Sequence, residues 1–308
     1  MQDIERVDGA MRLRRLLIVG SVALILLWLL VPVARAGMLL FTPPWRGGPG
    51  AASADLRAQT VRFSASDGVN LRGWLLKKSA AVPTVILAAG FKEDRLTMVP
   101  YARFLRRAGY NVLLYDSRGT GSSGGRFSLG VNEVDDVAGA VAYVQHRSDL
   151  HAHRVGLLGV SLGAGVVIVA AARIPAVSAT VADSAYVDQR ATVDRLDTFH
   201  LSRFTIPFAP LGPWVVDRLL GTSLSSFSPL SAVRRIRPRS LLLIHSRHDL
   251  NPTTPPSGAQ TLLRAAASPS ASLWMARRGG HADALAAQPG DYQRHVIAFF
   301  RRFLPIHG

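Results

Sequence analysis

A serine lies at the centre of the pentapeptide Gly159-Val160-Ser161-Leu162-Gly163, between an apolar run and a run of small apolar residues over 164–172. This order predicts a strand, a sharp turn and a helix, with Ser161 at the turn. Such a turn strains the serine backbone, so the positions two before and two after it must be small, as Gly159 and Gly163 are. The hydroxyl would face solvent beside the first amides of the helix, which is where a nucleophile is useful. A helix-capping serine is the alternative.

A serine hydroxyl becomes a good nucleophile when a histidine takes its proton and a carboxylate orients that histidine. In sheets of this kind the chain order is serine, acid, histidine. Asp249 follows the apolar run 241–244, so we place it on a loop at the carboxyl end of a strand. His281 follows a short predicted strand and two glycines, which leave it on a loop. We therefore predict Ser161, Asp249 and His281 as a catalytic triad.

Other residues compete for two of these roles. Asp183 is the alternative acid, because it follows an apolar segment one predicted strand earlier. His245 lies inside a strand pattern, and His248 is too close to the predicted acid in sequence to span the gap to the serine. His295 belongs to the pattern of a C-terminal helix. The histidine of the glycine-rich loop is therefore the predicted base.

Two further segments resemble the α/β-hydrolase superfamily, and the resemblance runs from about residue 60 to the C-terminus. Residues 110–123 are similar to its strand-and-loop motif Asp-x-Arg-Gly-x-Gly-x-Ser. Residues 85–91 are similar to the strand and loop that supply an oxyanion amide, with Ala89 where histidine is usual. The resemblance implies an α/β-hydrolase fold with a mostly parallel eight-stranded sheet and helices on both faces. It also implies the backbone N–H groups of Phe91 and Leu162 as the oxyanion hole.

Two charged residues of the first of these segments, Asp116 and Arg118, are predicted to be structural. Charges buried in a loop need a charged partner or hydrogen bonds. Glu133 and Asp136 follow soon afterwards at helical spacing. We expect these two carboxylates to be the partners of Arg118.

The alternation of apolar and polar runs predicts the domain organisation. Residues 59–308 form the hydrolase domain, which opens with an antiparallel hairpin of 60–63 and 70–76. The alternation breaks over 186–231, a stretch rich in proline and aromatic residues. We interpret this stretch as a small cap inserted between two strands. An ordinary long excursion is the alternative.

The N-terminal segment predicts a membrane anchor. Residues 16–33 are apolar and uncharged, and a helix of about 18 residues spans about 27 Å, close to the thickness of the hydrocarbon layer. Arginines are more frequent before this run than after it, which places the N-terminus in the cytoplasm and the hydrolase domain outside it. We expect a basic segment over 1–15, a transmembrane signal anchor over 16–34 and a linker over 35–58. The alternative is release of a secreted protein by signal-peptide cleavage near Ala36.

Composition sets further bounds. The chain has 308 residues, a formal net charge of +16 and no cysteine. No nucleic-acid-binding motif accompanies the charge, so we expect no nucleic-acid partner. We also expect no metal or cofactor, because thiolates and helical histidine pairs are missing. The densest basic cluster, 234–239, would face anionic lipid headgroups.

These patterns predict a membrane-tethered serine hydrolase that cleaves a carboxylic ester or thioester through an acyl-enzyme intermediate. Its partners would be a small acyl substrate and the lipid bilayer. The runner-up is a serine peptidase similar to the prolyl-oligopeptidase branch, although residues 37–60 leave no room for the large propeller usual there. A catalytically silent binding or scaffold protein on the same fold is the third possibility.

Overall fold

Strands whose residues are all buried form the centre of the computed structural model, which describes residues 2–41, 43–44, 56–150, 154–196, 198–201, 204–207, 211–266 and 268–306. Every residue is buried in β3 (Thr84–Ala88), β4 (Asn111–Asp116), β5 (Val155–Val160) and β9 (Ser240–Ser246). Parallel strands covered on both faces have such continuous apolar sequences. The apolar runs in the sequence are therefore the interior of a sheet covered by helices.

The eight strands have the order β1-β2-β4-β3-β5-β6-β9-β10. The remaining members are β1 (Gln59–Ser64), β2 (Asn70–Leu76), β6 (Val177–Asp183) and β10 (Ala271–Ala276). β1 and β2 form the predicted antiparallel hairpin, and β2 is also antiparallel to β4. The other pairings are parallel. The mostly parallel eight-stranded sheet expected from the resemblance is confirmed.

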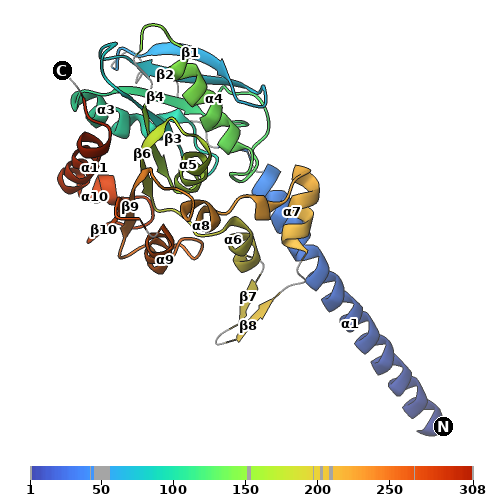
Figure 1. Cartoon of the computed structure of the whole chain (residues 1–308). Helices are drawn as coiled ribbons and strands as arrows, with labels where there is room; N and C mark the ends of the chain where they lie inside the picture. The colour runs from blue at the N-terminus through green and yellow to red at the C-terminus, as the bar shows by residue number, and fades with distance from the viewer. Residues whose placement is uncertain are drawn as a thin grey trace. The chain divides into compact units, whose positions relative to one another are not determined.

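Helices cover both faces of this sheet (Figure 1). One face carries α3 (Val99–Arg107) and α11 (Pro289–Phe303), preceded by the short α10 (Ala284–Ala287). The other carries α4 (Glu133–Gln145), α5 (Leu162–Arg173), α8 (Pro229–Val233) and α9 (Pro256–Ala266). Short 3-10 helices occupy Arg95–Met98 and Leu224–Ser226.

The chain divides into two compact units. The sheet unit is Pro43–Thr192 with Thr222–Gly308, and the α1 unit is Met1–Thr42 with Val193–Gly221. Of the predicted cap over 186–231, the residues 193–221 belong to the α1 unit, whereas α8 packs against α5 and α9 in the sheet unit. The insertion between β6 and β9 begins with α6 (Gln189–Leu196).

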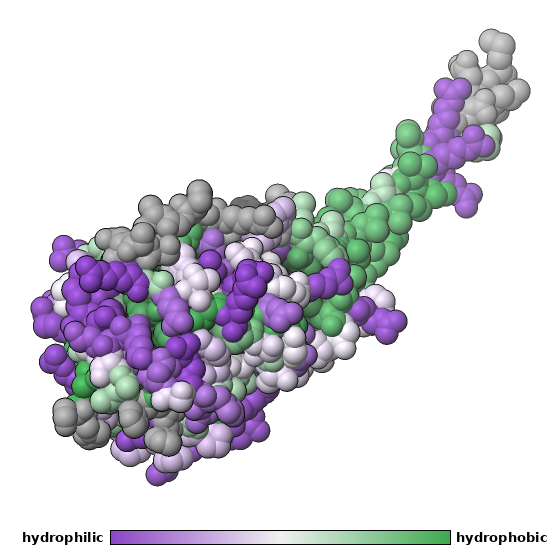
Figure 2. Space-filling view, turned by 90° about the horizontal axis from the view of Figure 1, so that it is seen from above, coloured by the Kyte–Doolittle hydropathy of each residue, from purple (hydrophilic) through white to green (hydrophobic). Residues whose placement is uncertain are grey.

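The α1 unit contains one long helix, a hairpin and a short helix. These are α1 (Gln2–Phe41), β7 (Thr198–Leu201) paired with β8 (Phe204–Pro207), and α7 (Gly212–Leu220), which packs against α1. α1 continues past the predicted anchor, so the first part of the expected linker is helical. Among the described residues, α1 is the one helix long and apolar enough to cross a membrane. Figure 2 shows a continuous hydrophobic surface along the middle of this helix, with hydrophilic residues towards its N-terminal end.

Candidate active site

Ser161 lies between the end of β5 and the start of α5, as the sequence predicts. Its backbone has φ 53° and ψ −115°, a conformation that is strained for any residue with a Cβ. A Cβ at Gly159 would overlap the carbonyl oxygen of Gly163. A Cβ at Gly163 would overlap the carbonyl oxygens of Ala88 and Ala89. Backbone atoms have no room to move aside, so the turn that presents Ser161 requires both glycines.

His281 meets this serine from a loop that follows β10. Its Nε2 lies 2.8 Å from Ser161 Oγ, within hydrogen-bonding distance. The loop makes its bends at Gly279 (φ +93°) and at Ala282 (φ 56°). It is held by a hydrogen bond from Ser246 Oγ to the Gly279 carbonyl and by one from Ala282 N–H to Ser184 Oγ (3.1 Å). The two-glycine loop therefore places the imidazole in a fixed position.

Asp249 lies on the other side of this imidazole, on the loop that follows β9. Its Oδ2 is 2.8 Å from His281 Nδ1, and its side chain is fully buried. Nδ1 therefore donates to the carboxylate, which leaves Nε2 as the acceptor for the Ser161 hydroxyl. The structure thus brings together all three residues that the sequence nominated, in the required chain order.

Two neighbours of Asp249 were missed by reasoning from sequence. Thr254 Oγ1 lies 3.1 Å from Asp249 Oδ2 and 2.9 Å from His281 Nδ1. The buried Nε2 of His245 lies 3.0 Å from Asp249 Oδ2 and 2.9 Å from the Thr254 carbonyl oxygen. Because both neighbours of Nε2 are acceptors, this nitrogen carries a proton. The spacing of four residues between His245 and Asp249, at a strand end, was the available signal.

Burial lowers the pKa of His245, which favours the neutral imidazole. A neutral ring protonated on Nε2 donates to the Asp249 carboxylate without adding a charge beside it. The carboxylate also accepts the Asn251 N–H at 2.9 Å on its other oxygen. Asp249 is therefore a buried charge with several donors, as a buried charge requires.

Asp183, the alternative acid, supports the loop of His281 indirectly. Its Oδ1 accepts from Ser184 Oγ at 3.0 Å, and that same hydroxyl oxygen accepts the Ala282 N–H. His281 Nδ1 instead contacts Asp249 and Thr254. The pKa of Asp183 is raised to about 6, mainly because the carboxyl is buried.

The predicted oxyanion donors follow the carboxyl ends of the neighbouring strands β3 and β5, one on a loop and one at the start of α5. The loop after β3 holds Phe91 between Gly90 and Glu93, whose carboxylate accepts the Gly90 N–H at 3.1 Å. Leu162 is the first residue of α5. Among the described residues, no hydrogen bond engages the N–H of Phe91 or of Leu162. Both amides are thus free to donate to a substrate oxygen.

The charged residues of the loop after β4 have structural partners. Arg118 pairs with Asp136 at 2.8 Å and with Asp67 at 2.7 Å. Glu133, the other expected partner, instead accepts from Ser128 Oγ at 2.6 Å. The prediction is thus right for one carboxylate and wrong for the other, because the turn before α4 needs Glu133 as its acceptor.

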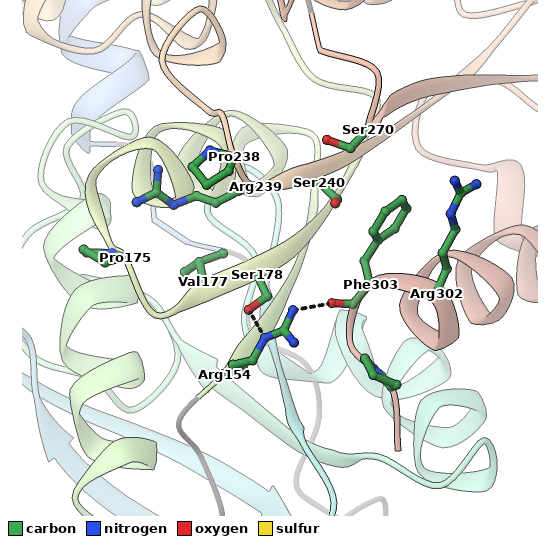
Figure 3. Close-up of a pocket in the computed structure, with 11 residues that line it drawn as sticks. Arg154, Pro175, Val177, Ser178, Pro238, Arg239, Ser240, Ser270, Arg302 and Phe303 are labelled. Atoms are coloured by element: carbon green, nitrogen blue, oxygen red, sulfur yellow. Dashed lines mark hydrogen bonds between the residues drawn. The ribbon is translucent and has the colours of Figure 1, made fainter. Parts of the chain in front are cut away.

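A pocket at the opposite edge of the sheet is separate from these residues (Figure 3). It is lined near the amino ends of β5, β6, β9 and β10 by Arg154, Ser178, Ser240 and Ser270. Ser161 and Asp249 follow the carboxyl ends of β5 and β9 instead. Arg154 is also held by Ser178 Oγ (2.8 Å) and by the Phe303 carbonyl (3.0 Å). A substrate of Ser161 must therefore approach the other edge.

The sequence matches the X-Pro dipeptidyl-peptidase (S15) family over residues 34–209, which is more than half of the chain. The chain belongs to this family. The matched region contains Ser161 and ends before Asp249 and His281. The structure brings these two later residues to the serine.

Two curated proteins and one solved structure are similar to this chain. The uncharacterized protein YfhR of Escherichia coli (strain K12) is 27% identical over 250 residues, 79% of this chain and 80% of that protein. The thiohydrolase aneE of Aspergillus aculeatus is 31% identical over 115 residues, 36% of each chain. The structure of the Pyrococcus furiosus esterase Pf2001 superposes with a TM-score of 0.68 at 25% identity, covering 85% of this chain and 99% of the esterase. The S15-family chain is thus a hydrolase with the α/β-hydrolase fold.

Proposed function

We propose that the protein is a membrane-anchored serine hydrolase that cleaves carboxylic esters or thioesters. The observation that carries the proposal is the continuous set of contacts from Ser161 Oγ through His281 to Asp249, with both distances at 2.8 Å. This geometry supports proton transfer from the serine to the imidazole as the serine attacks. A serine that merely capped a helix would not need a histidine and a buried acid at these positions.

The mechanism follows from the positions of the groups. Ser161 Oγ attacks the acyl carbon while His281 Nε2 accepts the hydroxyl proton, and Asp249 stabilises the resulting imidazolium. The Phe91 and Leu162 amides donate to the oxygen that becomes negative. His281 then gives the proton to the leaving alkoxide or thiolate, and the acyl group remains on the serine. Water, activated by His281, releases the acid and restores the hydroxyl.

Exposed apolar residues next to the site favour an apolar acyl group. Phe91, whose N–H is a proposed oxyanion donor, is 43% exposed. Leu250, which follows Asp249 in the sequence, is 92% exposed. The Phe91 ring is fixed by an edge-on contact with Phe127, with ring centroids 5.1 Å apart. Lys92 Nζ lies 5.6 Å from the Phe91 ring centroid. The named thiohydrolase and esterase among the relatives support this substrate class.

The anchor is part of the proposal. α1 is helical through Ala36 to Phe41, and it packs against α7. Proteases prefer exposed, extended segments, so this continuous helix supports a retained anchor over cleavage near Ala36. With the arginine bias, the N-terminus would lie in the cytoplasm and the sheet unit outside it.

A peptidase is the second candidate, because the matching family is one of X-Pro dipeptidyl-peptidases. The same serine, histidine and acid perform amide hydrolysis in principle, so substrate comparison separates the two functions. We expect p-nitrophenyl esters of increasing acyl length to be cleaved faster than an X-Pro p-nitroanilide by the full-length protein in detergent. Cleavage of the anilide with a higher kcat/KM than any ester would favour the peptidase. Ser161→Ala should remove either activity, whereas the matched variant Ser272→Ala, at an exposed serine of β10, should keep it.

A further inference from the structure

The short helix α7 carries large apolar side chains on its outer face. Trp214 is 59% exposed and Leu219 is 44% exposed. Val215 is half-buried, and Arg218 is the exposed charged residue of this helix. A surface helix of a water-soluble domain has the reverse pattern, with polar residues outward.

The positions of these residues define two faces. At about 100° per residue, Trp214, Val215, Arg218 and Leu219 fall within about 140° of the helix circumference. The buried residues Gly212, Pro213 and Val216 fall on the opposite side. α7 therefore has a packed inner face and an apolar outer face that carries one cation.

The outer face belongs to the same compact unit as α1. α7 packs against α1, and Figure 1 shows it beside the C-terminal part of that helix. Within residues 11–41 the buried positions are Pro32 and Ala36, also near this end. The apolar run of α1 ends at Val33, while Met38 and Phe41 beyond it remain exposed. α7 thus lies at the level where an α1 that spans a bilayer would leave the hydrocarbon.

We propose that α7 is an interfacial helix whose Trp214, Val215 and Leu219 face enters the lipid headgroup boundary of the bilayer that α1 spans. The proposal rests on the proposed membrane anchor. Tryptophan favours this boundary, because its ring is apolar and its N–H is polar. Arg218 on the same face would meet anionic headgroups. An aqueous surface gives no comparable reason for an exposed tryptophan and leucine on one short helix.

The consequence concerns the chain segment between β6 and β9. This segment connects the strand that ends in Asp183 to the strand that leads to Asp249, and α7 lies within it. Contact of α7 with lipid would fix this insertion to the membrane at a second point besides α1. The hydrolase would then sample substrates delivered at the lipid surface.

The natural absence of cysteine permits a direct test. Single-cysteine variants Trp214→Cys and Leu219→Cys of the full chain are labelled with an environment-sensitive fluorophore and placed in phosphatidylcholine–phosphatidylglycerol vesicles. Leu24→Cys, in the middle of the apolar run, reports insertion of α1, and Ser272→Cys on β10 reports an exposed position of the sheet unit. Quenching by lipids that carry a spin label near the headgroup or deep in the acyl chain gives the depth of each fluorophore.

We expect the labels at 214 and 219 to lie about 5–10 Å into the headgroup boundary, the label at 24 to lie deep, and the label at 272 to be unquenched. A deep label at 24 with unquenched labels at 214 and 219 would overturn the interfacial helix and leave the anchor intact. An unquenched label at 24 would overturn the anchor and the interfacial helix together. Equal quenching at 214 and 272 would indicate unspecific adsorption and overturn the proposal. Labels at 214 and 219 shielded from aqueous iodide but not quenched by lipid would indicate a protein partner or a second copy, and would also overturn it.

Discussion

The sheet unit and the α1 unit place the same kinds of side chain in opposite environments. Leu114 of β4 and Phe300 of α11 are completely buried, whereas Leu24 of α1 is 68% exposed. Apart from Phe91 and Leu250, the exposed large apolar residues of the described chain all belong to the α1 unit. The sheet unit thus buries nearly all of its large apolar side chains, whereas the α1 unit exposes many of its own. Water drives the apolar residues of the first unit into its interior, and under the proposed anchor lipid would surround those of the second.

The largest effect that we predict concerns the sheet unit. His281→Ala should lower kcat for p-nitrophenyl esters on the order of 10⁴-fold, because Ser161 loses the group that takes its proton. His295→Ala is the matched control, since His295 stacks on Trp274, with ring centroids 4.6 Å apart, and no hydrogen bond or ion pair in the described part of the chain joins it to Ser161, His281 or Asp249. Steady-state kinetics in detergent provides the measurement. Equal losses in the two variants would show that removal of an imidazole acts through folding.

A pair of leucine substitutions tests the comparison itself. Leu114→Ala should reduce the free energy of unfolding of the sheet unit by about 2–5 kcal/mol, because it leaves a cavity in a buried strand. Leu24→Ala should change it by less than about 0.5 kcal/mol, as expected for an exposed position. Urea titration of the two variants in detergent micelles, followed by tryptophan fluorescence, measures both changes. Similar losses would mean that the two units share one core.

The buried carboxyl of Asp183 gives a pH dependence. Its pKa is raised to about 6 in the folded protein, so between its usual value of 3.8 and about 6 the folded state holds a proton that the unfolded chain releases. The stabilisation from this group is complete below that window and is lost as the pH rises through it. Asp183→Asn cannot titrate. The free energy of unfolding of Asp183→Asn minus that of wild type should therefore rise by up to about 3 kcal/mol from the low-pH side of the window to its high-pH side.

Urea titrations on either side of the window test this prediction. Ser272→Ala, which changes an exposed residue without a titratable group, is the control, and its difference from wild type should stay constant with pH. If the difference between Asp183→Asn and wild type also stays constant, the Asp183 carboxyl is ionised across the whole window in the folded protein.

The smallest effect that we predict concerns orientation within the site. Thr254→Val removes a hydroxyl that lies 3.1 Å from Asp249 Oδ2 and 2.9 Å from His281 Nδ1. A hydrogen bond to a charged group contributes about 1.5–3 kcal/mol, so kcat should fall about 10- to 100-fold with little change in KM. Thr254→Ser should restore most of it. A Thr254→Ser variant as slow as Thr254→Val would contradict this, because the hydroxyl alone would then not account for the loss.

Most of the sheet unit was predictable from sequence, because each of its elements has a local signal. The buried strands appear as apolar runs, and Ser161 is marked by the two glycines that its turn requires. Asp249 and His281 were nominated by chain order and loop setting, and the structure brings them together. These choices depend on local sterics and on the rule that parallel strands end at one edge.

What sequence did not supply depends on contacts between distant segments. His245 was excluded as the catalytic base because it lies in a strand pattern. In the structure it lies near the end of β9, and its Nε2 is 3.0 Å from Asp249 Oδ2. Asp183 supports the loop of His281 through Ser184, a link between residues about a hundred positions apart. The grouping of α7 with α1 joins segments still farther apart in the chain. No local pattern encodes such pairings, since many alternative pairings satisfy the same apolar periodicity.

The central claim is that His281 and Asp249 activate the Ser161 hydroxyl. The most direct measurement is the reaction of the full-length protein with a fluorophosphonate probe, followed by mass spectrometry of the labelled peptide. Our account predicts one modification, at Ser161, that is absent in Ser161→Ala, strongly slowed in His281→Ala and unchanged in Ser272→Ala. Labelling of another serine, or equal labelling rates in wild type and His281→Ala, would contradict it.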